Sequence, residues 1–121
     1  MAEGDLAQAF AGYFYNLFQH DRQQLANVFT ETSTMTFEGQ IFKGKEQIMT
    51  KLLSLPKNLI RVVTTADCQS LDATFSLVFL LGQLQSDNDP PHSFAETFLL
   101  KNINGQFYVM NSFFRLVLHN A

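Results

Sequence analysis

The sequence predicts an α+β domain in which helices cover one face of a bent antiparallel sheet. Apolar residues recur at helical spacing early in the chain, and the second half reads as long strands joined by short turns. Helices that come first and a meander that comes last favour α+β over an alternating α/β fold. The 121 residues, taken as one domain 1–121, suit a single core.

Two helices are predicted before residue 30. The first, with Asp5 as a plausible N-cap, has an apolar stripe at three- and four-residue steps, formed by Leu6, Phe10, Tyr13, Phe14, Leu17 and Phe18. The second follows Asp21, whose carboxylate can accept backbone N–H bonds, and its apolar face is formed by Leu25, Val28 and Phe29. A third helix is predicted over 45–55, and Pro56 ends it.

The remaining segments predict strands. Residues 33–38 alternate between apolar and polar side chains, and a short strand or loop follows between Gly39 and Gly44. Long strands are predicted after the third helix, separated by the turns 87–91 and 102–105; they cover residues 59–68, 74–85, 93–101 and 106–119.

Two of these strands carry apolar side chains on both faces. Val78–Leu81 is apolar without interruption, and the neighbours Phe113 and Phe114 must point to opposite faces. A sheet that is apolar on both faces needs cover on both. The helices can cover one face, and a second copy of the chain can cover the other, so we expect a homodimer.

Composition excludes several partners. The net charge is −3 and the eight Lys and Arg residues are scattered, so the basic footprint of a nucleic-acid-binding protein is absent. The longest apolar run, Leu77–Leu81, is too short to cross a bilayer, and we expect no membrane insertion. The N-terminal residues 1–8 lack the apolar core of a signal peptide, and the single cysteine, Cys68, indicates a reducing compartment and is expected to be a buried, inert thiol.

No catalytic, cofactor or metal site is predicted. The three histidines, His20, His92 and His119, lack the spacing of zinc ligands. Tyr15 with Asp67 could imitate the tyrosine and carboxylate of a cavity isomerase, which is the best enzyme hypothesis that the sequence offers. We expect a protein that is not an enzyme.

Three acids lie beside turns. Glu38 ends a strand, and Asp87 and Asp89 precede Pro90-Pro91. Ordinary strand-end and Asx-turn chemistry explains all three, and the aspartates lack the spacing and the later Glu of a calcium loop. The alternative is an acidic rim that binds a partner.

A series of short motifs resembles the nuclear transport factor 2 family, from about residue 6 to the C-terminus. In chain order the motifs are Met35–Gly39 (MTFEG), Phe42–Gly44 (FKG), Leu55-Pro56, Gly82–Leu84 (GQL), Asp87–Pro90 (DNDP), Phe98–Asn104, Asn111 and Phe114–Leu116 (FRL). The resemblance implies a cone-shaped fold: a bent antiparallel sheet wrapped by about three helices around a hydrophobic cavity. The thirteen Phe residues suit such a core or cavity.

The resemblance also implies a function. Members of this family are homodimers that carry the GDP form of the GTPase Ran into the nucleus. They bind Ran-GDP and the Phe-rich repeats of nuclear pore proteins, and they are found in cytoplasm and nucleus, concentrated at the nuclear envelope and its pores. In the family, an aromatic side chain of Ran enters the cavity and acids at the rim pair with basic side chains. A related alternative is the mRNA-export cofactor, which heterodimerises with a larger receptor.

Matched motif by motif, the resemblance implies a Ran-GDP site made of five residues: Phe37, Glu38, Arg61, Asp87 and Asp89. Four positions depart from the family pattern. Arg61 stands where a rim His is usual, and Lys57 stands where an aromatic follows the Leu-Pro motif. A surface aromatic is replaced by Glu3, which bears on binding to pore repeats, and an acid is replaced by Ser112.

Overall fold

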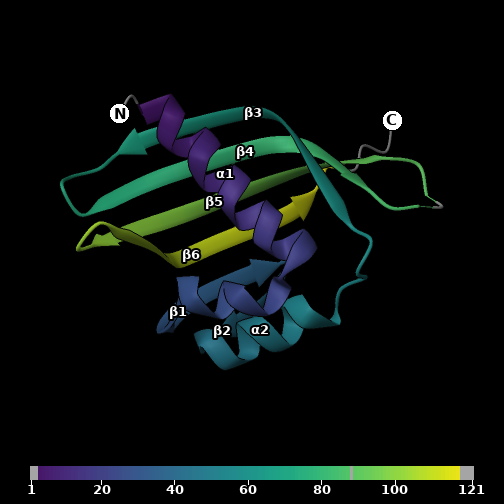
Figure 1. The fold of residues 1–121 in the computed structure, drawn as a ribbon, viewed down its shortest axis with the longest axis horizontal. Coiled ribbons are helices and arrows are strands. Elements are labelled where there is room, and N and C mark those ends of the chain that lie inside the picture. The colour runs from purple at the N-terminus through teal and green to yellow at the C-terminus, as the bar shows by residue number, and fades with distance from the viewer. Residues whose placement is uncertain (1–2, 88, 118–121) are drawn as a thin grey trace.

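The computed structural model describes residues 3–87 and 89–117, and it contains three helices and six strands within those residues (Figure 1). In chain order these are α1 Glu3–His20, the 3-10 helix η1 Arg22–Val28, β1 Phe29–Phe37, β2 Gln40–Lys43, α2 Gly44–Ser54, β3 Ile60–Ser70, β4 Phe75–Gln85, β5 His92–Ile103 and β6 Gln106–Leu116. The predicted α+β class is confirmed. No helix of the described residues is long and apolar enough to cross a membrane.

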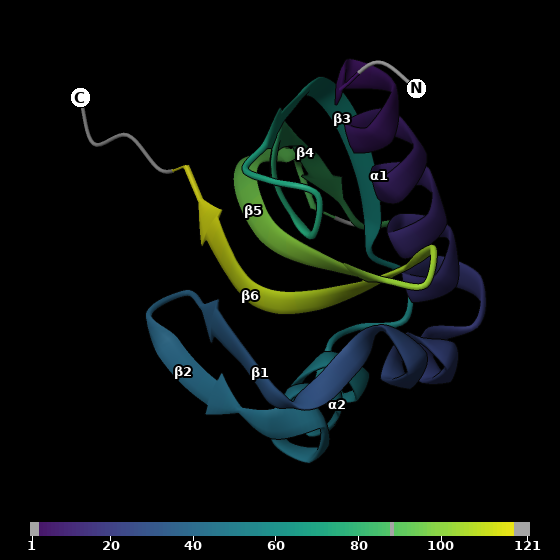
Figure 2. The same ribbon diagram turned by 90° about the vertical axis from the view of Figure 1, so that its left-hand side faces the viewer.

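The strands form one bent, unclosed sheet in the order β2-β1-β6-β5-β4-β3 (Figure 2). All neighbours are antiparallel except β1 and β6, which run parallel, so the expectation of a wholly antiparallel sheet is wrong for that pair. Each strand could be recognised from its own residues, whereas its neighbour across the sheet could not. Register shifts leave Thr64 of β3 as an extra residue opposite β4 and Met110 of β6 as an extra residue opposite β5, and such bulges bend and twist strands.

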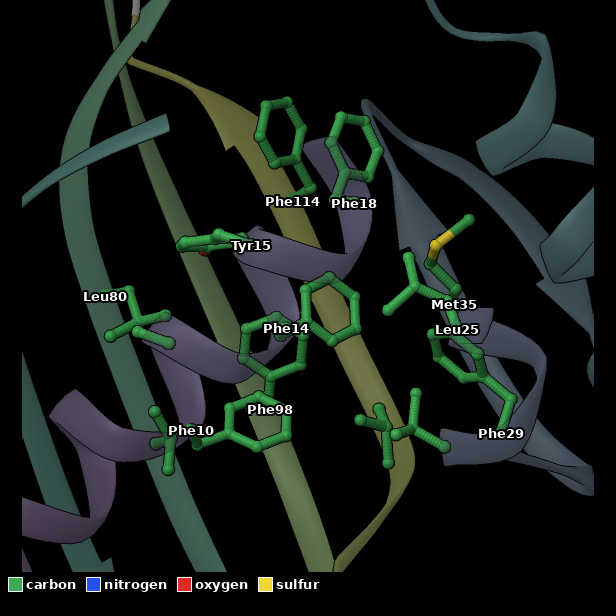
Figure 3. Packing of buried hydrophobic residues seen from close by; sticks show 14 of the residues in the cluster. Phe10, Phe14, Tyr15, Phe18, Leu25, Phe29, Met35, Leu80, Phe98 and Phe114 are labelled. Carbon is green, nitrogen blue, oxygen red and sulfur yellow. The ribbon is translucent and has the colours of Figure 1, made fainter. Parts of the chain in front are cut away.

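Helix α1 crosses one face of the sheet, which we call the inner face, and α2 packs against β1 (Figures 1 and 2). The predicted stripe of α1 is the centre of the core: Phe10, Phe14 and Phe18 are each at most 5% exposed. Their rings meet those of the sheet, for example Phe14 and Phe98 with centroids 5.0 Å apart (Figure 3). Aromatic burial of this size is the main stabilising contribution expected for a domain this small.

Both predicted N-caps are wrong. Asp5 lies inside α1, which already begins at Glu3. Asp21 precedes η1 but its side chain makes no capping hydrogen bond. Backbone groups replace it, because the Asp21 N–H donates to the Leu17 carbonyl and the Gln24 N–H donates to the Asp21 carbonyl. The segment is a tight 3-10 connection, and Phe29, expected on a helix, begins β1 four residues earlier than predicted.

The two long strands have the two faces that the sequence indicated. Val78 and Leu80 are buried on the inner face, while Phe79 and Leu81 are exposed on the opposite, outer face. Phe114 is 2% exposed and its neighbour Phe113 is 57% exposed, so they do point to opposite faces. Residues 118–119 of the predicted last strand lie outside the described residues.

Candidate protein-binding rim

The strand register gathers the five candidate residues at one end of the sheet. Phe37, at the end of β1, is level with Phe114 near the end of β6. Because β5 begins where β6 and β4 end, the β4–β5 turn with its aspartates lies at this same end. Arg61, at the start of β3, pairs with Leu84 at the end of β4. Residues about fifty positions apart in the sequence therefore lie at the same end of the sheet, which we call the rim, and the β4–β5 turn extends beyond the end of β1 there (Figure 1).

Glu38 is anchored to the end of β6. It is exposed and takes a left-handed backbone conformation (φ 50), followed by Gly39 at φ 85, which turns the chain from β1 into β2. Its N–H donates to the Phe114 carbonyl at 3.0 Å, and its carboxylate Oε1 accepts from the Leu116 N–H. The side chain therefore holds a fixed place at the rim and also completes the backbone bonding of β6.

Phe37 is half-buried and stacks on Phe114, with ring centroids 4.5 Å apart and planes within 6°. The Lys51 ammonium lies 5.3 Å from the Phe37 centroid, on the side of α2. Phe37 thus joins the rim to the buried aromatic cluster through Phe114.

Asp87 and Asp89 are both exposed in the β4–β5 turn, together with Pro90 and Pro91. The Ser86 hydroxyl donates to Asp89 Oδ2 at 3.2 Å. Proline restricts the residue before it to extended backbone, so Pro90 limits the conformations open to Asp89. Both carboxylates are exposed to water at the rim.

Arg61 does not project from the rim as the resemblance implied. Its side chain is 2% exposed and points into the fold, where its Nε lies 3.3 Å from Glu96 Oε1. The guanidinium carbon lies 4.3 to 5.8 Å from four ring centroids, those of Tyr15, Phe18, Phe94 and Phe114. We call these four rings and Glu96 the guanidinium cage; Figure 3 shows three of its rings, those of Tyr15, Phe18 and Phe114.

The enzyme hypothesis named the wrong carboxylate. Asp67 is exposed on β3, whereas the Tyr15 hydroxyl donates to Glu96 Oε1 at 2.7 Å inside the core. Burial raises the pKa of Glu96, and the nearby Arg61 charge and the Tyr15 hydrogen bond lower it in part. Burial and the Glu96 charge raise the pKa of Tyr15 well above its usual value. The pair is enclosed by packed side chains, not by an open substrate cleft.

Sequence reasoning missed Glu96, although a signal for it was present. On β5 the residues Phe94, Glu96 and Phe98 alternate with half-buried neighbours, so Glu96 shares the inward face of two fully buried aromatics. A carboxylate on such a face must have a partner, because an isolated buried charge is costly. The partner, Arg61, lies 35 residues away and could not be read from the pattern of β5.

Other sequence expectations concern single side chains. Cys68 is half-buried, not fully buried as expected. The departure at Ser112 lies inside the fold, because this residue is 4% exposed, while Lys57 is exposed. Among residues 3–87 and 89–117, no three His, Cys, Asp or Glu side chains are grouped so that they could hold a metal ion.

Comparison with known proteins gives the family. Residues 6–116 match the model of the nuclear transport factor 2 domain. The chain belongs to the nuclear transport factor 2 family. It is 35% identical over 114 residues to nuclear transport factor 2 of Schizosaccharomyces pombe, covering 92% of this chain and 93% of that one. It is 37% identical to the probable nuclear transport factor 2 of Caenorhabditis elegans over 123 residues, covering 95% and 92% of the two chains.

Comparison with solved structures gives the same family and the same fold. Nuclear transport factor 2 from Cryptosporidium parvum superimposes with a TM-score of 0.85 at 31% identity over 93% of both chains. The C. albicans Mtr2-Mex67 M domain complex matches with a TM-score of 0.77 at 13% identity, over 95% of this chain and 94% of that one. At that identity the second likeness shows a shared fold alone.

Proposed function

We propose that this chain is a nuclear import carrier that binds Ran-GDP at the rim and binds Phe-rich repeats of nuclear pore proteins elsewhere on its surface. It acts as a homodimer without catalysing a reaction, and it moves between cytoplasm and nucleus through the pores, where it is concentrated. The family's transport role supports this proposal. The single observation that supports it is that three exposed acids, Glu38, Asp87 and Asp89, follow strand ends at the same end of the sheet.

The rim suits a basic partner surface. Its carboxylates supply orientation and charge pairing, and the half-buried face of Phe37 supplies apolar area beside them. A few such contacts give an affinity in the micromolar range, about −8 kcal/mol, after the costs of association. That strength suits a carrier that must release its cargo.

The outer face supports the homodimer. Phe79, Thr97 and Phe113 lie side by side on three adjacent strands, because Phe79 pairs with Thr97 and Thr97 pairs with Phe113. Phe79 and Phe113 are exposed together with Leu81, two residues along β4. We call Phe79, Leu81 and Phe113 the outer apolar face. Exposed apolar side chains gathered on one sheet face are typical of subunit interfaces.

Two other functions fit the structure less well. An export-cofactor-like subunit would need a larger partner to cover the outer apolar face, and the pure chain would then not form a stable homodimer. A cavity isomerase would need Tyr15 and Glu96 to meet substrate, but both are at most 8% exposed and the space beside them is filled by Arg61. The carrier is therefore the function that the rim and the outer face favour together.

The test is capture of Ran on the immobilised chain, with Ran loaded with GDP or with GTP in parallel. We expect strong retention of the GDP form and little of the GTP form. Equal retention of both forms, or of neither, would contradict the proposal. A parallel binding assay with a Phe-Gly repeat peptide and a Ser-Gly control peptide tests the second partner.

A further inference from the structure

Arg61 is held in an unusual way for a buried arginine. Its guanidinium meets one carboxylate oxygen at 3.3 Å, but Nε and Nη1 have no hydrogen-bond partner among the described residues. That oxygen, Glu96 Oε1, also accepts the Tyr15 hydroxyl. A guanidinium carries five N–H donors, and a buried donor without an acceptor costs stability. Arg61 is therefore enclosed but poorly bonded.

Arg22, by contrast, is an arginine whose guanidinium is well supplied with hydrogen-bond acceptors. Its guanidinium lies 3.8 Å from the same Phe18 ring and donates to four backbone carbonyl oxygens. These belong to Phe18, Leu52, Leu55 and Pro56, so Arg22 joins α1 to the end of α2. Burial lowers the pKa of Arg22 and the nearby Arg61 charge lowers it further, which means that the two cations repel each other. Arg61 has the weaker bonds of the two and begins at the rim.

We propose that the guanidinium cage is a recognition site for an arginine side chain of a basic partner, and that Arg61 occupies it in the free chain as an internal competitor. Four ring faces or edges and one carboxylate are the chemistry that recognises a planar cation. A neutral side chain in the same place would leave the buried Glu96 carboxylate without a counter-charge, bonded only to the Tyr15 hydroxyl. A lysine would bring the charge but not the planar group that fits between rings.

The rim provides the route and the attraction. The Arg61 backbone is at the start of β3, so its side chain enters the cage from the rim, and its withdrawal vacates that same path. The acids Glu38, Asp87 and Asp89 draw basic side chains to this end. This inference rests on the proposed function only in taking the rim as the binding face, and it adds a second, deeper contact to it.

The cage can be tested without Ran. In the variant Arg61→Ala, methylguanidinium at millimolar concentration should raise the melting temperature saturably, by a few degrees. The wild-type chain, whose cage is filled, and the double variant Arg61→Ala with Glu96→Gln should show no such rise. Methylammonium and toluene are the probes for a simple cation and an apolar ring. A response to toluene and not to methylguanidinium, or an equal response in the wild type, would overturn the assignment.

Exchange is tested on the unaltered chain. The Arg61 Nε–H signal, shifted by the surrounding rings, is followed by NMR during titration with a hexa-arginine peptide and a hexa-lysine peptide. Both peptides are attracted to the rim, but only hexa-arginine should move the Arg61 signal saturably to the position of a solvated arginine. An unmoved signal at saturation, or the same change with both peptides, would contradict the proposal while leaving Ran-GDP binding at the rim untouched.

Discussion

The inner and outer faces of the sheet each contain an exception to the usual distribution of side chains. The inner face holds charge, with Arg61 and Glu96 at 2% and 5% side-chain exposure, while the outer face exposes Phe113 at 57%. A buried charge and an exposed apolar patch are the informative exceptions in a globular domain, because ordinary core residues explain only the fold. The core aromatics stabilise the fold, whereas we propose that both exceptions are places where this chain binds other molecules.

The largest expected effect is on the outer face. We expect Phe113→Asp to weaken homodimer association at least about a hundredfold, because a carboxylate would be buried without a partner at the centre of an apolar interface. Light scattering with size exclusion at micromolar concentration measures it. The matched control Leu53→Asp adds the same charge at an exposed position on α2 and should remain a dimer. A wild-type mass near 13.8 kDa would contradict the dimer itself.

On the inner side, the well-bonded arginine should matter most for stability. Arg22→Ala removes four hydrogen bonds to carbonyl oxygens and should lower the free energy of unfolding by about 3 kcal/mol. Urea unfolding monitored by circular dichroism measures it. A loss under about 1 kcal/mol would show that Arg22 does not hold α2 against α1.

The charged pair of the cage should contribute much less. Replacing a buried ion pair by neutral side chains of similar volume is often neutral or stabilising. We therefore expect the free energy of unfolding of the double variant Arg61→Met with Glu96→Gln to be higher than that of the wild type, or at most about 1 kcal/mol lower. If the double variant loses as much stability as Arg22→Ala, the pair is structural, and the contrast between the two arginines fails.

The smallest effect is a pH dependence. In Arg61→Met, Glu96 loses the charge that lowers its pKa, so its folded pKa rises further above the usual value of about 4.5. The folded state then binds more protons than the unfolded state, and stability falls as the pH rises through the folded pKa. We expect the deficit of Arg61→Met against the wild type to be larger at pH 8 than at pH 5. Adding Glu96→Gln should abolish the difference, and a deficit that does not change with pH would exclude Glu96 as its source.

The sequence predicted what alternation and helical spacing control. The stripe of Phe10, Phe14 and Phe18 is core, and the opposed neighbours Phe113 and Phe114 lie on the two faces. Such features follow from the periodicity of single elements. They place side chains on faces without any knowledge of neighbouring strands.

Most predictions that failed depend on contacts between distant segments, and one depends on local turn geometry. The parallel pairing of β1 with β6 depends on the path of the chain between the two strands. The residues of either strand alone do not predict it. The burial of Arg61 follows from an inward carboxylate on β5. The Asp21 cap failed because a backbone carbonyl filled the same role in a tighter turn. The family motifs place Arg61 at the correct end of the sheet, but they do not predict that its side chain points into the core.

The rim variants must respect the structural role of Glu38. Since its carboxylate accepts the Leu116 N–H, a charge reversal there would disturb β6 as well as the rim. Glu38→Gln keeps an acceptor and removes the charge, and Asp87→Asn and Asp89→Asn do the same in the turn. A control that removes three exposed acids elsewhere, Glu31→Gln with Glu46→Gln and Asp21→Asn, has the same net charge.

Calorimetric titration of Ran-GDP into these two triple variants and the wild type tests the central claim most directly. We expect micromolar binding by the wild type and by the control, and a loss of at least a hundredfold, about 3 kcal/mol, in the rim variant, which should remain folded and dimeric. Wild-type affinity in the rim variant, or an equal loss in both triple variants, would show that Ran-GDP is not bound through these three carboxylates.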